Sequence, residues 1–139
     1  MTPKEKARKV VDKMFESDAF SQWLGIERIE EDAGRSVLQM TIRSEMLNGF
    51  GIAHGGITYS LADSALAFAS NSHGRKAVSV ETSISHTVPL REGDVITAWA
   101  EEETQTNKIG IYRVLVKKED QIVAIFKGVV YRTSNEWEL

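Results

Sequence analysis

Cysteine is absent from this chain of 139 residues, and its absence removes several kinds of site. Disulfides, thiolate nucleophiles and cysteine-based metal sites are all excluded. The three histidines, His54, His73 and His86, have no zinc-binding spacing among themselves. No Gly-x-Ser-x-Gly segment occurs, which argues against a serine hydrolase of the common α/β type. We therefore expect a site without a metal ion.

Long hydrophobic runs are also absent, so no segment approaches the length that spans a bilayer. The N-terminal segment MTPKEKARKVV is charged where a secretory signal would be apolar. The net charge is −3, and acidic and basic residues are mixed along the chain. Such a distribution gives no electrostatic footprint for nucleic acid or an anionic membrane. We expect a cytoplasmic protein that binds neither.

Size and composition predict one folded domain. Apolar residues make up 42% of the chain and charged residues 27%, which is ordinary for globular proteins. No repeat, linker or low-complexity segment divides it. We expect a single domain over residues 1–139, in which residues 1–20 form an N-terminal helical extension.

Hydrophobic periodicity predicts helices followed by a series of strands. The expected helices are 3–16, 18–24 and 57–71, and the expected strands are 26–31, 36–42, 77–88, 95–103, 109–118 and 122–132. The last four strands are joined by short connections at 89–94, 104–108 and 119–121, which favour antiparallel neighbours. A sheet of this size must bury one face, and the helix 57–71 is the obvious partner. We expect an α+β fold with an antiparallel sheet of about six strands around this helix.

Asp63 is the only formally charged side chain between Glu45 and Arg75, and it interrupts an otherwise apolar helical run. Burial of a lone carboxylate is costly unless hydrogen bonds or a function compensate. Asp63 is therefore a candidate acid, base or nucleophile. The alternative is a solvent-facing or helix-capping aspartate. Small residues on the same helix face, such as Gly56 and Ala67, indicate close approach of another backbone, and the residues alone leave both interpretations open.

Two glycines, Gly55 and Gly56, begin the same helix directly after His54. The first N–H groups of a helix lack intrahelical partners, and together with the helix dipole they suit an anion or a developing oxyanion. An ordinary glycine-rich turn is the alternative. A dinucleotide-binding loop is disfavoured, because His54 occupies the third glycine position of the pattern that Gly49 and Gly51 open.

The segments 48–56, Asn-Gly-Phe-Gly-Ile-Ala-His-Gly-Gly, and 61–65, Leu-Ala-Asp-Ser-Ala, resemble a known family. They are similar to the hotdog-fold acyl-coenzyme A (acyl-CoA) thioesterases of the phenylacetic acid degradation (PaaI) type. The resemblance extends over roughly residues 20–132. It implies a hotdog fold, hydrolysis of an acyl-CoA thioester, and no cofactor beyond the coenzyme A of the substrate.

The resemblance also implies roles for individual residues. Asp63 corresponds to the nucleophile or general base, the amide of Gly55 to the group that polarises the thioester carbonyl, and Asn48 to a side chain near that carbonyl. The expected substrate-binding residues are His54, Gly56, Ser64, His86 and Arg91. Ser64 follows the aspartate where a hydroxyl could orient water. His86 stands where many relatives have an aromatic residue, so the acyl preference is left open between aryl, phenylacetyl and aliphatic groups.

Family members place their sites at a two-fold interface, so the resemblance implies a homodimer, and pairing of dimers into a homotetramer.

Two functions other than thioester hydrolysis remain open. A hotdog dehydratase would need a histidine paired with a carboxylate, and a non-catalytic acyl-CoA binding protein would need no carboxylate against an oxyanion hole.

Overall fold

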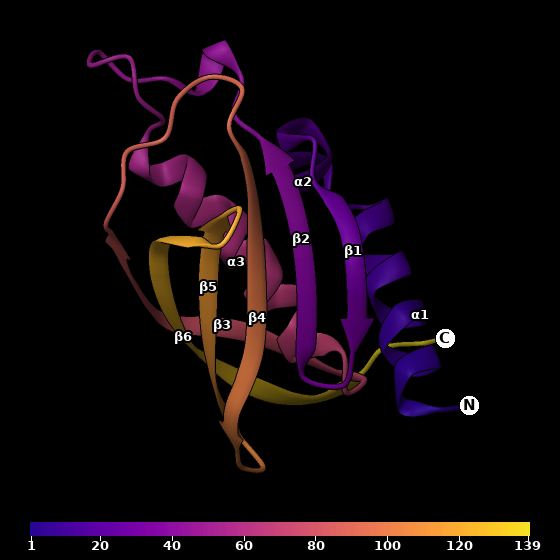
Figure 1. Ribbon diagram of the computed structural model, residues 1–139. Coiled ribbons are helices and arrows are strands. Elements are labelled where there is room, and N and C mark those ends of the chain that lie inside the picture. Colours follow the sequence, from indigo (N-terminus) through magenta and orange to yellow (C-terminus); the bar gives the residue numbers. More distant parts are fainter.

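A computed structural model describes all 139 residues and shows one antiparallel sheet curved around a central helix (Figure 1). The strands are β1 (Glu27–Asp32), β2 (Arg35–Thr41), β3 (Arg75–His86), β4 (Val95–Gln105), β5 (Ile109–Lys118) and β6 (Gln121–Glu136). The helices are α1 (Pro3–Glu16), α2 (Ala19–Leu24) and α3 (Gly55–Asn71), with a 3₁₀ turn at Ser44–Met46. No helix is both long and apolar enough to cross a membrane. The expected α+β class and central helix are confirmed.

The strand order is β1-β2-β4-β5-β6-β3, which corrects one expectation. Residues 89–94 were expected to join neighbouring strands, but β3 pairs with β6 and lies at the opposite edge from β1. The connection therefore crosses from one part of the sheet to another. It runs past the loop before α3, where Leu90 O accepts a hydrogen bond of 2.8 Å from Ala53 N. This crossing brings β3, α3 and the connection together at one end of the molecule.

Several element boundaries differ from expectation by a few residues, and two of these differences have a clear structural reason. Helix α3 begins at Gly55 rather than at residue 57, because the two glycines already adopt helical geometry after the extended His54. Strand β6 continues to Glu136, well past residue 132, because its pairing with β3 extends to Arg75. The N-terminal helix begins as predicted, and Thr2 caps it by accepting a hydrogen bond of 3.1 Å from Glu5 N.

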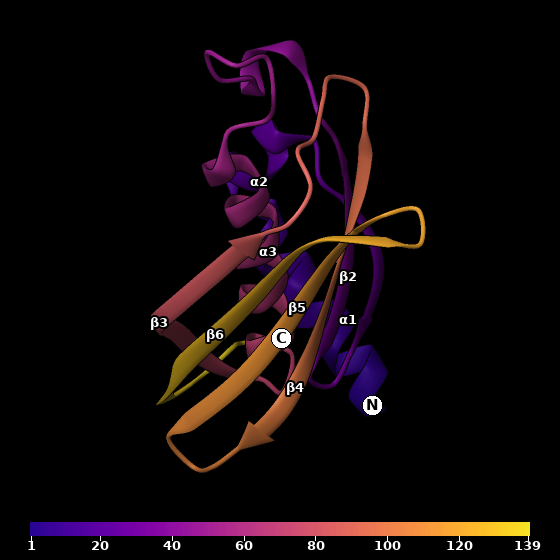
Figure 2. The same cartoon turned by 60° about the vertical axis from the view of Figure 1, so that its left-hand side comes forward.

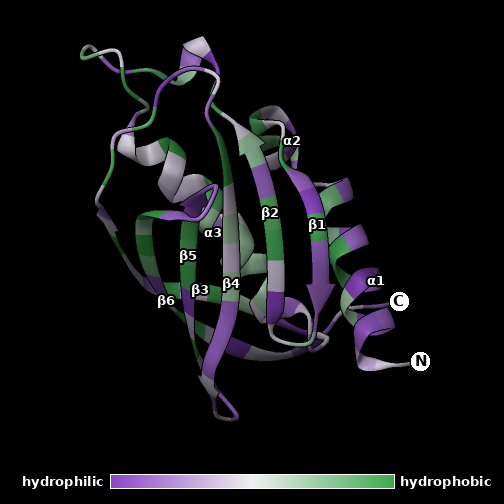
Figure 3. Cartoon of the chain, in the orientation of Figure 1, coloured by the Kyte–Doolittle hydropathy of each residue, from purple (hydrophilic) through white to green (hydrophobic).

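Helix α3 forms the centre of the core because it is apolar on most of its surface. Leu61, Ala65 and Phe68 are fully buried against the inner face of the sheet. Figure 3 shows the hydrophobic residues on α3 and the central strands, while the outer side of α1 is hydrophilic. Full burial of a leucine or phenylalanine side chain contributes roughly 1.5–3 kcal/mol. The core thus holds α3 firmly along its length.

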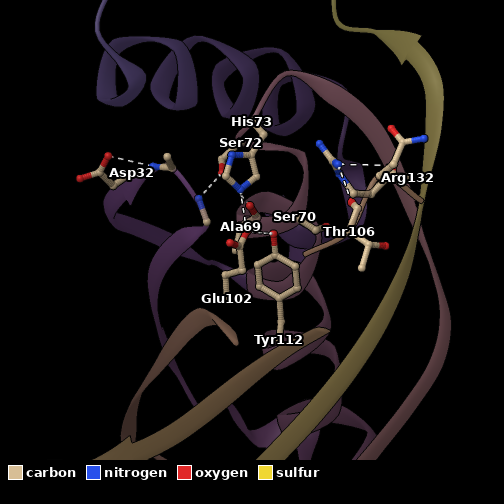
Figure 4. A network of polar contacts seen from close by, with 12 residues as sticks. Asp32, Ala69, Ser70, Ser72, His73, Glu102, Thr106, Tyr112 and Arg132 are labelled. Atoms are coloured by element: carbon tan, nitrogen blue, oxygen red, sulfur yellow. Dashed lines mark hydrogen bonds and ion pairs between the residues drawn. The ribbon is translucent and has the colours of Figure 1, made fainter. Parts of the chain in front are cut away.

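A polar network anchors the C-terminal end of α3 (Figure 4). Ser72 Oγ accepts a hydrogen bond of 2.8 Å from Gly34 N in the turn between β1 and β2. Glu102 Oε1 on β4 lies 2.7 Å from His73 Nε2 and accepts a hydrogen bond of 3.0 Å from the Tyr112 hydroxyl on β5. These contacts fix the C-terminal end of α3 to the turn between β1 and β2 and, through Glu102, to β4 and β5.

Strand β3 leaves one edge of the sheet open (Figure 2). It is 12 residues long, and it pairs only with β6. Val78 and Val80 on this strand are 57% and 60% exposed. A long edge strand with exposed β-branched residues is a template for pairing with another chain.

Gly128 on β6 marks a close approach of the sheet to α3. A Cβ atom at this position would overlap Cδ2 of the buried Leu66. We expect Gly128→Ala to lower the free energy of unfolding by about 1–3 kcal/mol, because the core has no room for the added methyl group. Urea denaturation followed by circular dichroism would measure the change. Gly49→Ala is the matched control, since nothing lies within 4 Å of its added Cβ, and an equal loss in both variants would contradict the expectation.

Candidate functional site

The N-terminus of α3 presents free hydrogen-bond donors. No side chain caps this helix, and the N–H groups of Gly55 and Gly56 donate to no acceptor within the chain. The His54 side chain likewise makes no hydrogen bond, although its backbone N–H donates over 2.9 Å to Met46 O. The helix dipole adds partial positive charge at this point. The arrangement favours a bound carbonyl oxygen or oxyanion.

Asn48 lies beside these donors, and its side chain bonds to the backbone of the loop that precedes α3. Its Oδ1 accepts hydrogen bonds from Phe50 N at 2.9 Å and from Ile52 N at 3.4 Å. The loop therefore fixes the amide group by its oxygen. The Nδ2 group makes no hydrogen bond within the chain and remains available as a donor.

Asn48, Gly55 and His86 line one cavity of about 340 Å³, here called the donor cavity. His86 Nε2 lies 3.2 Å from Gly55 O, so the last residue of β3 contacts the first turn of α3. The remaining lining residues include Thr58, Pro89 and Leu90. Thr58 was missed by the sequence reasoning, since a threonine inside a helix gives no signal of its own.

Asp63 lies in a second cavity of about 400 Å³, here called the carboxylate cavity. This cavity lies between the middle of α3 and the first half of β3, and its lining includes Ala67, Lys76 and Val78. The Asp63 carboxylate is partly buried and has no hydrogen bond or ion pair within the chain. As expected from the sequence, Asp63 is therefore a carboxylate on α3 without a compensating partner in its own chain.

Burial raises the pKa of the Asp63 carboxyl above its ordinary value, and the nearby charge of Asp18 raises it further. Asp18 caps α2, where it accepts hydrogen bonds from Ser21 N at 3.0 Å and Ser21 Oγ at 2.6 Å. Ser21 Oγ lies 2.8 Å from Ser64 Oγ. The Ser64 hydroxyl thus has a partner on α2. Asp18 and Ser21 were missed, because the helix cap they form gives no indication of the distant Asp63.

We expect Asp18→Asn to lower the pKa of Asp63, because it removes a like charge while asparagine still caps α2. Titration of the Asp63 side-chain carboxyl by ¹³C NMR measures this directly and does not depend on any activity. Asp120→Asn, in an exposed turn, is the control. An unchanged titration of Asp63 in the Asp18→Asn protein would show that Asp18 does not act on it.

The donors and the carboxylate do not meet within one chain. Gly55 and Asp63 are eight positions apart on α3, which is roughly 12 Å along the helix axis. A catalytic group must come within about 3 Å of the reacting atoms. Among the other predicted residues, Gly56 and His54 are exposed at the helix start, and Arg91 is exposed beyond the donor cavity and does not line it.

The family comparison agrees with this fold. Residues 50–125 match the thioesterase superfamily, and the matched segment includes part of the loop before α3, all of α3, strands β3 to β5 and the start of β6. The chain therefore belongs to the thioesterase superfamily and has its hotdog fold.

Its relatives indicate which type of thioesterase the chain is. Acyl-coenzyme A thioesterase PaaI of Escherichia coli K12 is 40% identical over 120 residues, which cover 86% of each chain. The solved structure of the E. coli PaaI protein from the phenylacetic acid degradation operon superposes with a TM-score of 0.95 at 36% identity, covering 97% of this chain and 99% of that one. A hypothetical thioesterase protein of Streptococcus pneumoniae TIGR4, solved with coenzyme A, has a TM-score of 0.83 at 25% identity and covers 90% and 98%. The chain is a thioester hydrolase of the PaaI type.

Proposed function

We propose that this protein hydrolyses an acyl-CoA thioester at a site shared between two subunits, with Asp63 of one and the helix N-terminus of the other. The observation that supports this most strongly is the division of the site. The donors lie in one cavity and the carboxylate in another, roughly 12 Å apart on α3. A second copy is the simplest source of the missing half of each site.

The open edge of β3 supports the same arrangement. Antiparallel pairing of β3 with its copy continues the sheet and covers Val78 and Val80. It also sets the two α3 helices against each other in opposite directions. The small residues Gly56, Ser60 and Ala67 on α3 allow a close approach. In this dimer the Asp63 of one subunit faces the Gly55 of the other.

The proposed chemistry follows from the free groups at the shared site. The Gly55 N–H and Asn48 Nδ2 donate to the thioester carbonyl oxygen and stabilise the oxyanion that forms on it. The ionised Asp63 either attacks the carbonyl carbon or takes a proton from an attacking water. In either route a new C–O bond forms, the C–S bond breaks, and the thiolate of coenzyme A leaves and is protonated. If Asp63 attacks directly, water then hydrolyses the acyl–Asp63 anhydride and restores the carboxylate. Free acid and coenzyme A are the products.

The outer face of the sheet supports a further assembly of dimers into a homotetramer. Trp99, Leu115 and Ile125 are in register across β4, β5 and β6 on this face, and Ile125 is 43% exposed. An apolar row on an otherwise polar sheet face suits contact with a second sheet. Analytical ultracentrifugation tests both levels of assembly, and a monomer at micromolar concentration would contradict the shared site.

Coenzyme A is the expected thiol of the substrate, because the S. pneumoniae relative was solved with coenzyme A and the E. coli relative is an acyl-CoA thioesterase. We expect a preference for aromatic acyl groups, because the E. coli protein comes from the phenylacetic acid degradation operon. His86 lines the donor cavity beside Val88 and Leu90, and so borders the path of the substrate.

Thiol release with a chromogenic reagent tests the proposed function. The panel comprises phenylacetyl-, benzoyl-, hydroxybenzoyl-, butyryl- and octanoyl-CoA. We expect turnover of at least one aryl or arylacetyl thioester. Binding of these compounds without thiol release, from a folded oligomer, would favour a non-catalytic acyl-CoA binding protein, and addition of water to an enoyl-CoA would favour a hydratase.

A further inference from the structure

Trp137 directly follows β6 and lies at one end of the carboxylate cavity, beside α1 (Figure 1). The floor of this cavity is the face of α3 that runs from Asp63 to Asn71. These two residues are eight positions apart, which is roughly 12 Å along the helix axis. Asp63 therefore lies at one end of the floor, and Trp137 lies at the other end, next to Asn71. The hydrolytic mechanism gives Trp137 no role.

Three contacts hold Trp137 in this place. Its indole Nε1 donates a hydrogen bond of 2.9 Å to Asn71 Oδ1. Its backbone N–H donates over 2.8 Å to Gly74 O. Lys76 Nζ lies 4.9 Å from the centroid of the indole ring, which is a distance typical of a cation–π contact. The ring is therefore held both by its edge and by one of its faces.

Asn71 is the residue that positions Trp137. Its side chain is buried, and Nδ2 donates to Ala67 O over 2.8 Å and to Ala77 O over 3.1 Å. Its Oδ1 accepts a hydrogen bond of 2.9 Å from Ala77 N in addition to the one from Trp137. The two donors and both acceptor positions of the amide are thus in use. Asn71 joins α3 and β3 to the residue after β6, so the helix that carries Asp63 also fixes the orientation of Trp137.

The lining between Asp63 and Trp137 is mostly hydrophobic. It comes from α1, α3, β3 and β6, and its apolar members are Met14, Leu66, Ala67, Ala77, Val78 and Val130. A concave site with apolar walls and few polar groups is suited to the hydrocarbon part of a ligand. The carboxylate cavity therefore offers space for an acyl group that begins at Asp63.

The proposed dimer gives the acyl group its direction. The carboxylate cavity lies along the first half of β3, and the donor cavity lies at the end of this strand, beside His86. In an antiparallel β3 pair the first half of one strand lies beside the second half of the other. The donor cavity of one subunit is then adjacent to the carboxylate cavity of its partner. With the thioester carbonyl held between the two, the thiol portion lies on the donor side and the acyl group extends from Asp63 towards Trp137.

We propose that Trp137 is a specificity-determining residue, which closes the far end of the carboxylate cavity and limits the length of the acyl group. This inference rests on the proposed function and on its dimer. A phenylacetyl group is shorter than the floor between Asp63 and Asn71, whereas an extended dodecanoyl chain is longer and meets the indole ring. The contacts with Asn71, Gly74 and Lys76 oppose displacement of the ring. The site therefore selects against long acyl chains.

Trp137→Ala tests the proposal through the binding of two non-hydrolysable thioethers, S-(2-phenylethyl)-coenzyme A and S-dodecyl-coenzyme A. Calorimetric titration measures the two dissociation constants. We expect the ratio of the dodecyl constant to the phenylethyl constant to fall by about tenfold or more in Trp137→Ala, since even one methylene that a pocket admits or rejects changes selectivity by roughly this factor. Partial unfolding of a variant weakens both ligands alike and leaves the ratio unchanged. In steady-state assays kcat/KM for dodecanoyl-CoA should rise relative to kcat/KM for phenylacetyl-CoA.

Trp23→Ala is the matched control, because Trp23 is half-exposed on α2 and lines neither cavity. Equal ratios in Trp137→Ala and Trp23→Ala would overturn the proposal. Trp137→Phe keeps an aromatic ring at the end of the cavity and should retain a ratio close to that of the unmodified protein. A ratio as low as that of Trp137→Ala would contradict a limit set by the bulk of the ring. Because the thioethers need no turnover, failure of thiol release by the unmodified protein contradicts the proposed function and not the size limit.

Discussion

Replacement of Asp63 by asparagine is expected to lower kcat for thioester hydrolysis by about two to four orders of magnitude, as is typical for loss of a general base or nucleophile. Asparagine has nearly the same shape but neither attacks a carbonyl nor accepts a proton. Thiol release measures the loss. Asp120→Asn, a change in an exposed turn, should retain full activity.

The Asp63→Asn substitution also distinguishes a loss of catalysis from a loss of folding. Burial raises the pKa of Asp63, so the folded chain favours the protonated form and the ionised carboxylate costs stability at pH values above that pKa. Removing the charge at neutral pH should therefore leave the denaturation midpoint unchanged or higher. A stable Asp63→Asn protein with normal turnover would disprove the assignment of Asp63 to catalysis.

Gly55→Pro is expected to lower kcat by about a hundredfold to a thousandfold, because it removes the N–H group proposed to hold the oxyanion. Proline is tolerated at the first position of a helix. His54, with φ of −55° and ψ of 138°, already has the extended backbone that a residue before proline adopts. Gly55→Ala is the matched control, since it keeps the N–H, and its Cβ would lie 3.2 Å from the movable ring of His86. Equal activity of the two variants would contradict an oxyanion role for this amide.

The two inactive variants together test the shared site. A dimer formed from one Asp63→Asn chain and one Gly55→Pro chain has one site with both residues intact and one with neither. Random assortment makes half the dimers mixed, so a mixture refolded together should regain about a quarter of the unmodified activity. No recovery, in a mixture shown to contain mixed dimers, would mean that Asp63 and Gly55 serve the same subunit.

Much of this fold could be predicted from the sequence, because alternation and helical spacing are local signals. The six strands, the central α3 and the N-terminal α1 follow from such patterns. The place of β3 does not. Its short connection to β4 resembles a hairpin in composition, but β3 pairs with β6 and not with β4. Strand order depends on contacts between segments far apart in the chain, which periodicity does not encode.

The candidate site was predictable in the same partial way. Asp63 and Gly55 stand out because a charge and paired glycines are unusual within an apolar helix. The influence of Asp18 on Asp63 was not predictable, because it depends on how α2 folds against α3. The gathering of Arg75, Lys108 and Arg132 around one hollow was not predictable either, because only the sheet brings these three residues together.

The late position of β6 in the chain sets the order in which the molecule can form. Strand β3 ends at His86, whereas β6, its only neighbour, begins at Gln121. During synthesis β3 therefore has no strand to pair with until both β4 and β5 have left the ribosome. Long-range pairings of this kind slow folding and leave unpaired edges exposed to other nascent chains. A truncated messenger RNA that ends before β6 would yield a chain in which both edges of β3 are unpaired. That product would be prone to aggregation and would not be a smaller enzyme.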